Sequence, residues 1–340
     1  MRRLLFALLA ALLAGVLGCD FTPTFNVPLP DFEPALTING TLVADSTVEV
    51  RVTVATDPYG PDRYDDLFPV PDGAVVTLLQ GGAVPKRLSL RSETCRRSLG
   101  WPEYESYECG AFVADAVVEA GATVTVRASA PGFPDAEATV AVPRHVPASV
   151  VIGPSVERPL PNDGKRLDTD LTVSFRDPPG PQRYGLLVVG EPYTNTYVVT
   201  TCDDDRTWTS CRDSTVEQRI DPATVGYTTS DPVLLAGART VPSTGTRFIS
   251  FTDETFDGQA RTFALRAQQF WYPSYSTDEP EPPVGVWLVA ADPTTFGAYQ
   301  IAWFSGGEGN PFAEPVDLPS NVVGGYGLLG AVAITEARAE

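Results

Sequence analysis

The 340-residue sequence is poor in the residues that most enzymes use, with a single histidine, His145, and a single methionine. A Ser-His-Asp triad or a multi-histidine metal site needs a positioned imidazole, but His145 lies in the linker-like segment VPRHVPASV. The sequence also lacks a G-x-S-x-G nucleophile motif and a phosphate-binding loop. We therefore expect no catalytic residue and no cofactor.

Positive charge is also scarce. The chain has 24 lysines and arginines against 43 aspartates and glutamates, for a net charge of -19, and its only lysines are Lys86 and Lys165. Because nucleic-acid binding needs a basic face, we expect no nucleic-acid partner. An acidic, lysine-poor surface fits a salt-rich habitat and equally a GC-rich genome, and composition does not separate the two.

Long apolar runs are absent beyond residues 4–18, which contain only Leu, Phe, Ala, Gly and Val. A membrane-spanning helix needs about 20 residues, whereas a basic start followed by a short apolar segment is typical of a secretion signal. The run ends at Val-Leu-Gly-Cys19, which resembles the bacterial lipoprotein box, where the cysteine thiol is acylated before cleavage. We predict a signal peptide over 1–18 and a palmitate-type lipid anchor at Cys19. The alternative is a plain signal peptide with an incidental cysteine.

Four cysteines remain after Cys19, namely Cys95, Cys109, Cys202 and Cys211. Four cysteines allow three pairings, and an oxidising envelope compartment preserves disulfides. We predict the near-neighbour pairs Cys95–Cys109 and Cys202–Cys211, since closing a loop of about 15 residues stabilises by roughly 3 kcal/mol. The alternative, a four-thiolate metal site, lacks the Cys-x-x-Cys spacing of such sites.

Alternating apolar and polar residues rich in Val and Thr predict β-strands through most of the chain, as in ALTINGTLV and STVEVRVTVAT. Turn signals such as Asp72-Gly73 and Pro131-Gly132 separate the strands. The spacing predicts an all-β protein with an N-terminal immunoglobulin-like antiparallel sandwich and a larger antiparallel sandwich or barrel-like second domain. The predicted divisions are a signal peptide at 1–18, a lipidated Pro-rich tether at 19–33, the first sandwich at 34–143, a linker at 144–155 and the second domain at 156–337.

Two local signals stand out in the second half. Phe256-Asp257-Gly258 is typical of a hairpin turn. Asp292-Pro293 is a helix start signal, with Asp as N-cap and Pro at the first helical position. We predict one short amphipathic helix over 293–305 that covers the sheet with an aromatic stripe.

Aromatic residues gather in two segments that we predict to be loops. Trp101, Tyr104 and Tyr107 lie between Cys95 and Cys109, and Trp271, Tyr272 and Tyr275 lie in FWYPSYSTDEPEPP. Exposed rings on loops of a rigid scaffold often carry recognition. We favour the second segment as a ligand-binding site; the alternative for either is packing against the sheets.

Acidic residues cluster twice. Asp203, Asp204 and Asp205 follow Cys202, and Asp253, Glu254 and Asp257 lie in a second acidic turn. Carboxylates could hold calcium, but neither segment has the glycine and alternation of an EF-hand loop. We therefore predict solvated acidic loops and no metal site, with Asp203, Asp204 and Asp205 as the weak calcium candidates.

Several stretches together resemble a known family. PALTINGTLV, PDGAVVTLLQGG, APGFPDAEATVAVP, FTDETFDG and NPFAEPVDLPSNVVGGYGLLGA follow the lipoprotein box in this order. They resemble the lipoprotein family of Bacteroidota-type envelopes called domain of unknown function 4249, over nearly the whole mature chain. The resemblance implies an outer-membrane lipoprotein that works beside a TonB-dependent transporter. It supplies no catalytic residues, and the two cysteine pairs are not part of its pattern.

The sequence thus predicts a non-catalytic envelope lipoprotein that binds a partner or an extracellular ligand at the outer membrane. Two alternatives remain open. A carboxylate-based glycan hydrolase would need two acids about 5–9 Å apart in a cleft, and a purely structural spacer would need no binding site.

Overall fold

The computed structural model describes residues 33–55, 70–100, 103–191, 193–202, 211–220, 223–237, 248–271, 281–298 and 320–339. In this part the chain is mostly β-strand with two short helices, which confirms the predicted all-β class. Residues Pro34–Glu340 form one compact unit, apart from Met1–Glu33. No described helix has the length and apolar character needed to cross a bilayer.

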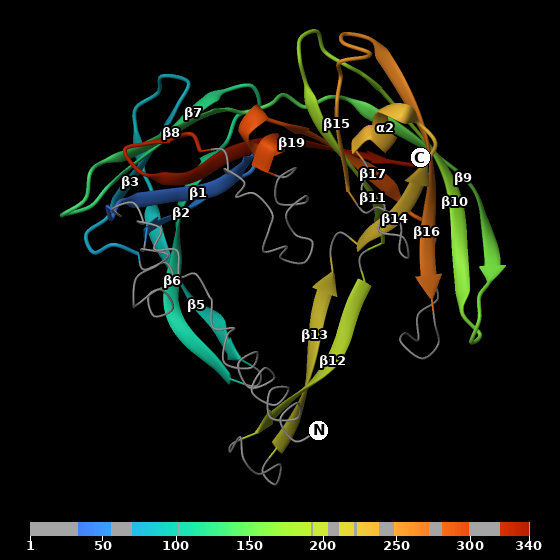
Figure 1. Cartoon of the computed structure of the whole chain (residues 1–340), viewed down its shortest axis with the longest axis horizontal. Coiled ribbons are helices and arrows are strands. Elements are labelled where there is room, and N and C mark those ends of the chain that lie inside the picture. Colours follow the sequence, from blue (N-terminus) through green and yellow to red (C-terminus); the bar gives the residue numbers. More distant parts are fainter. Residues whose placement is uncertain are drawn as a thin grey trace, which may run out of the picture. The chain divides into compact units, whose positions relative to one another are not determined.

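The first part of the chain forms two layers (Figure 1). One layer joins four strands in the order β5-β6-β2-β1, which are β5 (Ser89–Gly100), β6 (Glu103–Val117), β2 (Thr47–Val54) and β1 (Leu36–Val43). The other has the order β18-β8-β7-β3-β4, which are β18 (Val322–Val323), β8 (Ala136–Ala141), β7 (Thr123–Ser129), β3 (Val75–Gln80) and β4 (Lys86–Arg87). The alternation of apolar and polar residues in the sequence matches the alternation of buried and exposed side chains in β2, where Val48, Val50 and Val52 all enter the core.

The second part continues the first layer in the order β17-β11-β14-β16-β10-β9. These strands are β17 (Gly285–Ala291), β11 (Arg183–Gly190), β14 (Ala223–Thr229), β16 (Ala260–Trp271), β10 (Lys165–Arg176) and β9 (Ala148–Pro159). Strand β15 (Ile249–Thr252) pairs with β11, and the large sheet is open, with β5 and β9 at its ends in the described residues. The core here is aromatic: Phe251 packs against Tyr184 and Phe263, with ring centroids 5.3 and 5.2 Å away.

The last strand, β19 (Tyr326–Arg338), joins the two parts. Its first half pairs in parallel with β1, from Thr37↔Tyr326 to Val43↔Val332. Its second half pairs antiparallel with β17, from Ala291↔Val332 to Gly285↔Arg338. Strand β19 therefore pairs with strands on both sides of the predicted linker at 144–155, and it joins the two parts in one sheet.

A buried carboxylate fixes the point where β19 passes from one partner to the other. The Asp292 backbone N–H donates to Ala331 O at 3.0 Å, and Asp292 Oδ2 accepts the Ala331 N–H at 2.6 Å. Asp292 Oδ1 also accepts the Thr294 N–H at 2.8 Å, which confirms the predicted cap of a helix beginning at Pro293. The described part of this helix is 293–298, and residues 299–305 of the prediction lie outside the described residues.

Two local expectations differ from the structure. The predicted hairpin turn at 256–258 does connect β15 to β16, but β15 pairs with β11 whereas β16 pairs with β10 and β14. At this turn, Phe256 is buried in the aromatic core. A second helix, α2 (Pro232–Gly237), was not predicted; Asp231 Oδ1 caps it by accepting the Val233 N–H at 2.9 Å.

Replacing the junction carboxylate tests its role. Asp292→Ala removes the helix cap and leaves the buried Ala331 N–H with weaker pairing, so we expect a loss of about 2–4 kcal/mol in the free energy of unfolding. Urea denaturation measures this loss. Asp115→Ala, at an exposed position of β6, is the control and should change stability little. Equal effects of the two substitutions would contradict a special role for Asp292.

Candidate functional site

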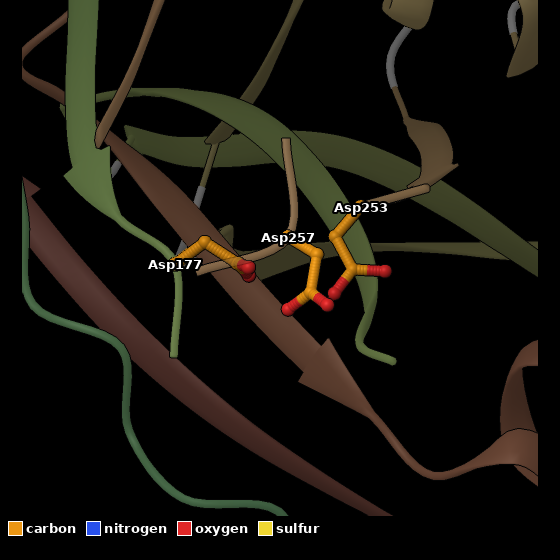
Figure 2. A group of neighbouring side chains, drawn as sticks. All are labelled: Asp177, Asp253 and Asp257. Carbon is orange, nitrogen blue, oxygen red and sulfur yellow. The ribbon is translucent and has the colours of Figure 1, made fainter. Parts of the chain in front are cut away.

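The structure gathers three aspartates from two segments of the second part (Figure 2). Asp177 follows β10, Asp253 follows β15, and Asp257 lies in the turn before β16. One carboxylate oxygen of each lies within 4.8 Å of the others. Asp177 and Asp253 are each only 2% exposed, whereas Asp257 is exposed. This acidic cluster contains two members of the predicted acidic turn. The prediction of a solvated loop is wrong for Asp253, which is buried because its carboxylate bonds to the facing segment, and Asp177 was missed because it stands alone in the sequence.

Each carboxylate of the acidic cluster accepts a hydrogen bond from the opposite segment. Asp177 Oδ2 accepts the Gly258 N–H at 2.7 Å, and Asp257 Oδ1 accepts the Gly180 N–H at 2.7 Å. Asp253 Oδ2 accepts the Gln182 N–H at 2.8 Å. The three bonds together fasten the loop at 177–182 to the turn at 253–259.

Burial and mutual repulsion shape the electrostatics of the acidic cluster. Burial raises the pKa of the Asp253 carboxyl, the hydrogen bond from the Gln182 backbone opposes this, and the charges of Asp177 and Asp257 raise it further. Burial also raises the pKa of the Tyr184 hydroxyl, with Asp177 adding to the effect. Tyr184 therefore stays protonated and donates to Asp177 Oδ1 at 2.5 Å.

These contacts indicate a structural cross-link. A calcium ion needs six to eight oxygen ligands at about 2.3–2.6 Å, but every carboxylate of the acidic cluster already accepts a hydrogen bond from the backbone of the facing segment. A glycan hydrolase needs its two acids open to the sugar, whereas Asp177 and Asp253 are buried. The arrangement holds two loops together and offers a substrate little access.

The cysteine pairs predicted from the sequence fall on two β-ribbons. β12 (Tyr193–Cys202) and β13 (Cys211–Ile220) form a two-stranded sheet of their own, in which Cys202 is directly opposite Cys211. In the β5–β6 ribbon, Cys95 is opposite Tyr107 and Cys109 is opposite Glu93, so the two cysteines are diagonal neighbours in the register. Directly opposite residues such as Cys202 and Cys211 have Cα atoms about 4.5–5.5 Å apart, within the range of disulfides, whereas diagonal neighbours are about 7–8 Å apart. Both disulfides stay predictions.

Other predicted site residues are placed differently or lie outside the described part. Tyr104 and Tyr107 lie within strand β6, so this segment is a β-ribbon and not the loop that we predicted. Tyr is among the residues that strands favour, which is the only local signal for a strand that these two positions carry. The predicted residues outside the described part are Cys19, Trp101, Asp203, Asp204, Asp205, Tyr272 and Tyr275. Those that lie in described strands but whose side chains are not described are Cys95, Tyr104, Tyr107, Cys202, Cys211 and Trp271.

The raised pKa of Asp253 predicts a pH-dependent stability. A carboxyl whose folded-state pKa exceeds its unfolded value loses stability as the pH rises above about 3.9. Asp253→Asn keeps an acceptor for Gln182 and removes the charge, so we expect a gain on the order of 1 kcal/mol in the free energy of unfolding at pH 7, which disappears as the pH falls to about 4. Urea denaturation at both pH values measures it, with Asp115→Asn, at an exposed position of β6 away from the acidic cluster, as the control. A variant less stable than the wild type at pH 7 would show that the charge is needed.

Peptide mapping without reductant tests the cysteine pairs. We expect one linked peptide joining Cys95 to Cys109, which are diagonal neighbours across β5 and β6, and another joining Cys202 to Cys211, which are directly opposite each other. The double variant Cys202→Ala/Cys211→Ala should lose only the second product. Four free thiols, or links between the two ribbons, would contradict the assignment.

The comparisons with known proteins identify a family and little else. Among solved structures the chain is similar to one described as the structural basis for the promiscuous specificity of the carbohydrate-binding modules from the β-sandwich superfamily. The match has 8% identity and a TM-score of 0.18 and covers 72% of this chain and 96% of that chain. A similarity this low carries no argument about function. A search of curated proteins finds no significant match.

The family match, in contrast, spans residues 22–338 and so covers both sandwich layers, the acidic cluster and strand β19. This range also agrees with the resemblance carried by the sequence stretches quoted above. The chain belongs to the family described as Domain of unknown function (DUF4249).

Proposed function

We propose that this chain is a non-catalytic lipoprotein of the cell envelope, anchored through Cys19 to the outer membrane, and that its β-rich body binds a partner there. A TonB-dependent transporter is the class of partner that we propose. The observation that carries the proposal is the apolar leader ending at Val-Leu-Gly-Cys19, directly before a Pro-rich segment.

The division of the chain supports an anchored body. Residues Pro34–Glu340 form a compact unit of their own, and residues 19–33 before it carry the prolines of the predicted tether. A Pro-rich tether extends by about 3 Å per residue, so it could hold the body tens of ångströms from a lipid surface. Each buried methylene of an acyl chain contributes about 0.8 kcal/mol, and two or more chains give stable anchoring.

The two ribbons support a binding role over a purely structural one. The β12–β13 ribbon pairs with no other described strand, and an isolated two-stranded ribbon is marginally stable in water. A disulfide between Cys202 and Cys211 would stabilise such a ribbon, and a spacer would have little use for it. Ribbons of this kind present loops and open backbone edges, through which partner proteins are often recognised.

The hydrolase alternative finds no support in the acidic cluster. Its two buried aspartates accept hydrogen bonds from backbone groups, and an acid at a glycosidase centre must reach the glycosidic oxygen.

Removing the acylated thiol tests the anchor. Cys19→Ala should move the protein from the membrane fraction to the soluble fraction, because no acyl chain can then be attached. Immunoblots of separated fractions measure the shift, and intact mass spectrometry of the wild type should show the added lipid. The variant Cys202→Ala/Cys211→Ala is the matched control and should stay with membranes. A wild-type protein with an unmodified amino terminus would contradict the proposal.

Recovery of a partner separates the binding role from the spacer role. A tagged wild-type chain, extracted in detergent, should recover a TonB-dependent transporter in stoichiometric amounts. If the chain were only a spacer, its signal peptide would still be cleaved and its lipid still attached, but no transporter would be recovered with it. Recovery of nothing beyond lipid would contradict the accessory role while leaving the anchor intact.

A further inference from the structure

The outer surface of β9, β10 and β16 forms a continuous face beside the aromatic core. The three strands lie next to one another (Figure 1), with β10 paired to both neighbours. Phe175, Phe263 and Leu265 point to the core, so the residues that alternate with them point outward. In the outward register, Arg166 lies between Arg158 and Phe270 at one end, and Ser174 lies between Ser149 and Thr262 towards the other. We call this surface the arginine face.

The charge of the arginine face is opposite to that of the chain. It carries four arginines and two aspartates, namely Arg158, Arg166, Arg176, Arg266, Asp168 and Asp170. The face thus has a surplus of two positive charges on a chain whose net charge is -19. An anionic ligand would complement this face and be repelled by most of the remaining surface.

One end of the arginine face is a rigid group of donors beside an exposed ring. Asp168, only 5% exposed, accepts Arg158 Nε at 2.6 Å and Arg166 Nη2 at 3.1 Å on the same oxygen. The Arg166 guanidinium carbon lies 6.0 Å from the centre of the Phe270 ring. Phe270 is 38% exposed, and the Arg158 side chain is 52% exposed. The buried carboxylate holds both guanidiniums in place while the outer edge of Arg158 meets solvent.

The other end of the arginine face is hollowed. Ser149, Ser174, Thr262 and Arg176 take part in lining an open depression of about 380 Å³, which is within the range of small-ligand sites. The hydroxyls of Ser174 and Thr262 lie 3.0 Å apart. From Arg166 to Arg176, the face is about 33 Å long at 3.3 Å per residue. Thr172 and Ala264, both small and exposed, lie between the ends.

We propose that the arginine face binds an extended acidic glycan, with carboxylates paired to arginines at both ends and sugar rings packed on Phe270 and in the hollow. Arginine recognises carboxylates by paired, charge-assisted hydrogen bonds. Cations spaced about 33 Å apart suit a polymer and not a single small anion. A peptide that adds as a strand would need a sheet edge, whereas this surface is a face. A nucleic acid carries a charge about every 1.7 Å of duplex, far more than a surplus of two can balance.

The glycan site goes beyond the proposed anchor and transporter partner and depends on neither. Isothermal titration of the full chain, extracted in detergent, against polygalacturonate at low salt tests it. We expect binding that weakens as salt is added, and about tenfold or greater weakening in Arg158→Ala and in Phe270→Ala. Arg176→Ala should weaken binding from the other end. Arg127→Ala, which breaks an exposed pair with Glu137 on the five-stranded sheet, is the matched control and should bind as the wild type does.

Several outcomes would overturn the proposal. Equal binding of fully methyl-esterified polygalacturonate would show that carboxylates are not recognised, and equal binding of polyglutamate would show that sugar rings are not. Absence of binding, or wild-type affinity in Arg158→Ala and Phe270→Ala with unchanged unfolding midpoints, would also overturn it. Membrane attachment and transporter recovery should be normal in all four variants, so a failure here is distinct from a failure of the proposed function.

Discussion

The pairing of strand β19 with both β1 and β17 is the constraint on which the rest of the structure depends. One strand of 13 residues completes a parallel ladder with the first strand of the compact unit and an antiparallel ladder with the second part. Val332 takes part in both ladders, and Asp292 holds its neighbour Ala331 through one backbone hydrogen bond and one hydrogen bond from the Ala331 N–H to the Asp292 carboxylate. Without β19, β1 and β17 would each lose a partner, and the long sheet would be cut in two. The chain therefore completes its fold only when its last residues are in place.

The acidic cluster, the arginine face and the two ribbons lie on different parts of the β-rich body. The aromatic core and the acidic cluster make the second part rigid, since three carboxylates fasten the loops that precede β11 and β16. The arginine face lies on the far side of that core, on strands whose backbone groups are already paired. The ribbons extend from the paired layers and carry the cysteines. The lipid-anchored binding protein that we propose would use such a division, because the anchor, the partner and the ligand would each have a separate surface.

Local signals in the sequence predicted local structure well. The alternation in β2, the Pro131-Gly132 turn between β7 and β8, where Gly132 has a φ of 86°, and the Asp292 cap were all predicted, because each depends on neighbouring residues. The sequence did not predict which strands and side chains would meet. The turn at 256–258 carried a hairpin signal, but β15 pairs with β11 and β16 pairs with β10 and β14, partners that are distant in the sequence. Asp177 meets Asp253, and Tyr326 meets Thr37, across long sequence separations that no local pattern records. The arginine face was missed for the same reason, since its charges are dispersed along three strands.

Hydrogen exchange in increasing denaturant, followed by mass spectrometry, tests the role of β19 most directly. If this strand couples the two parts, amides of β1 in the first part and of β10 in the second should become exchangeable at the same denaturant concentration, together with those of β19 itself. Exposure of β1 and β10 at clearly different concentrations, with β19 following only one of them, would contradict the account.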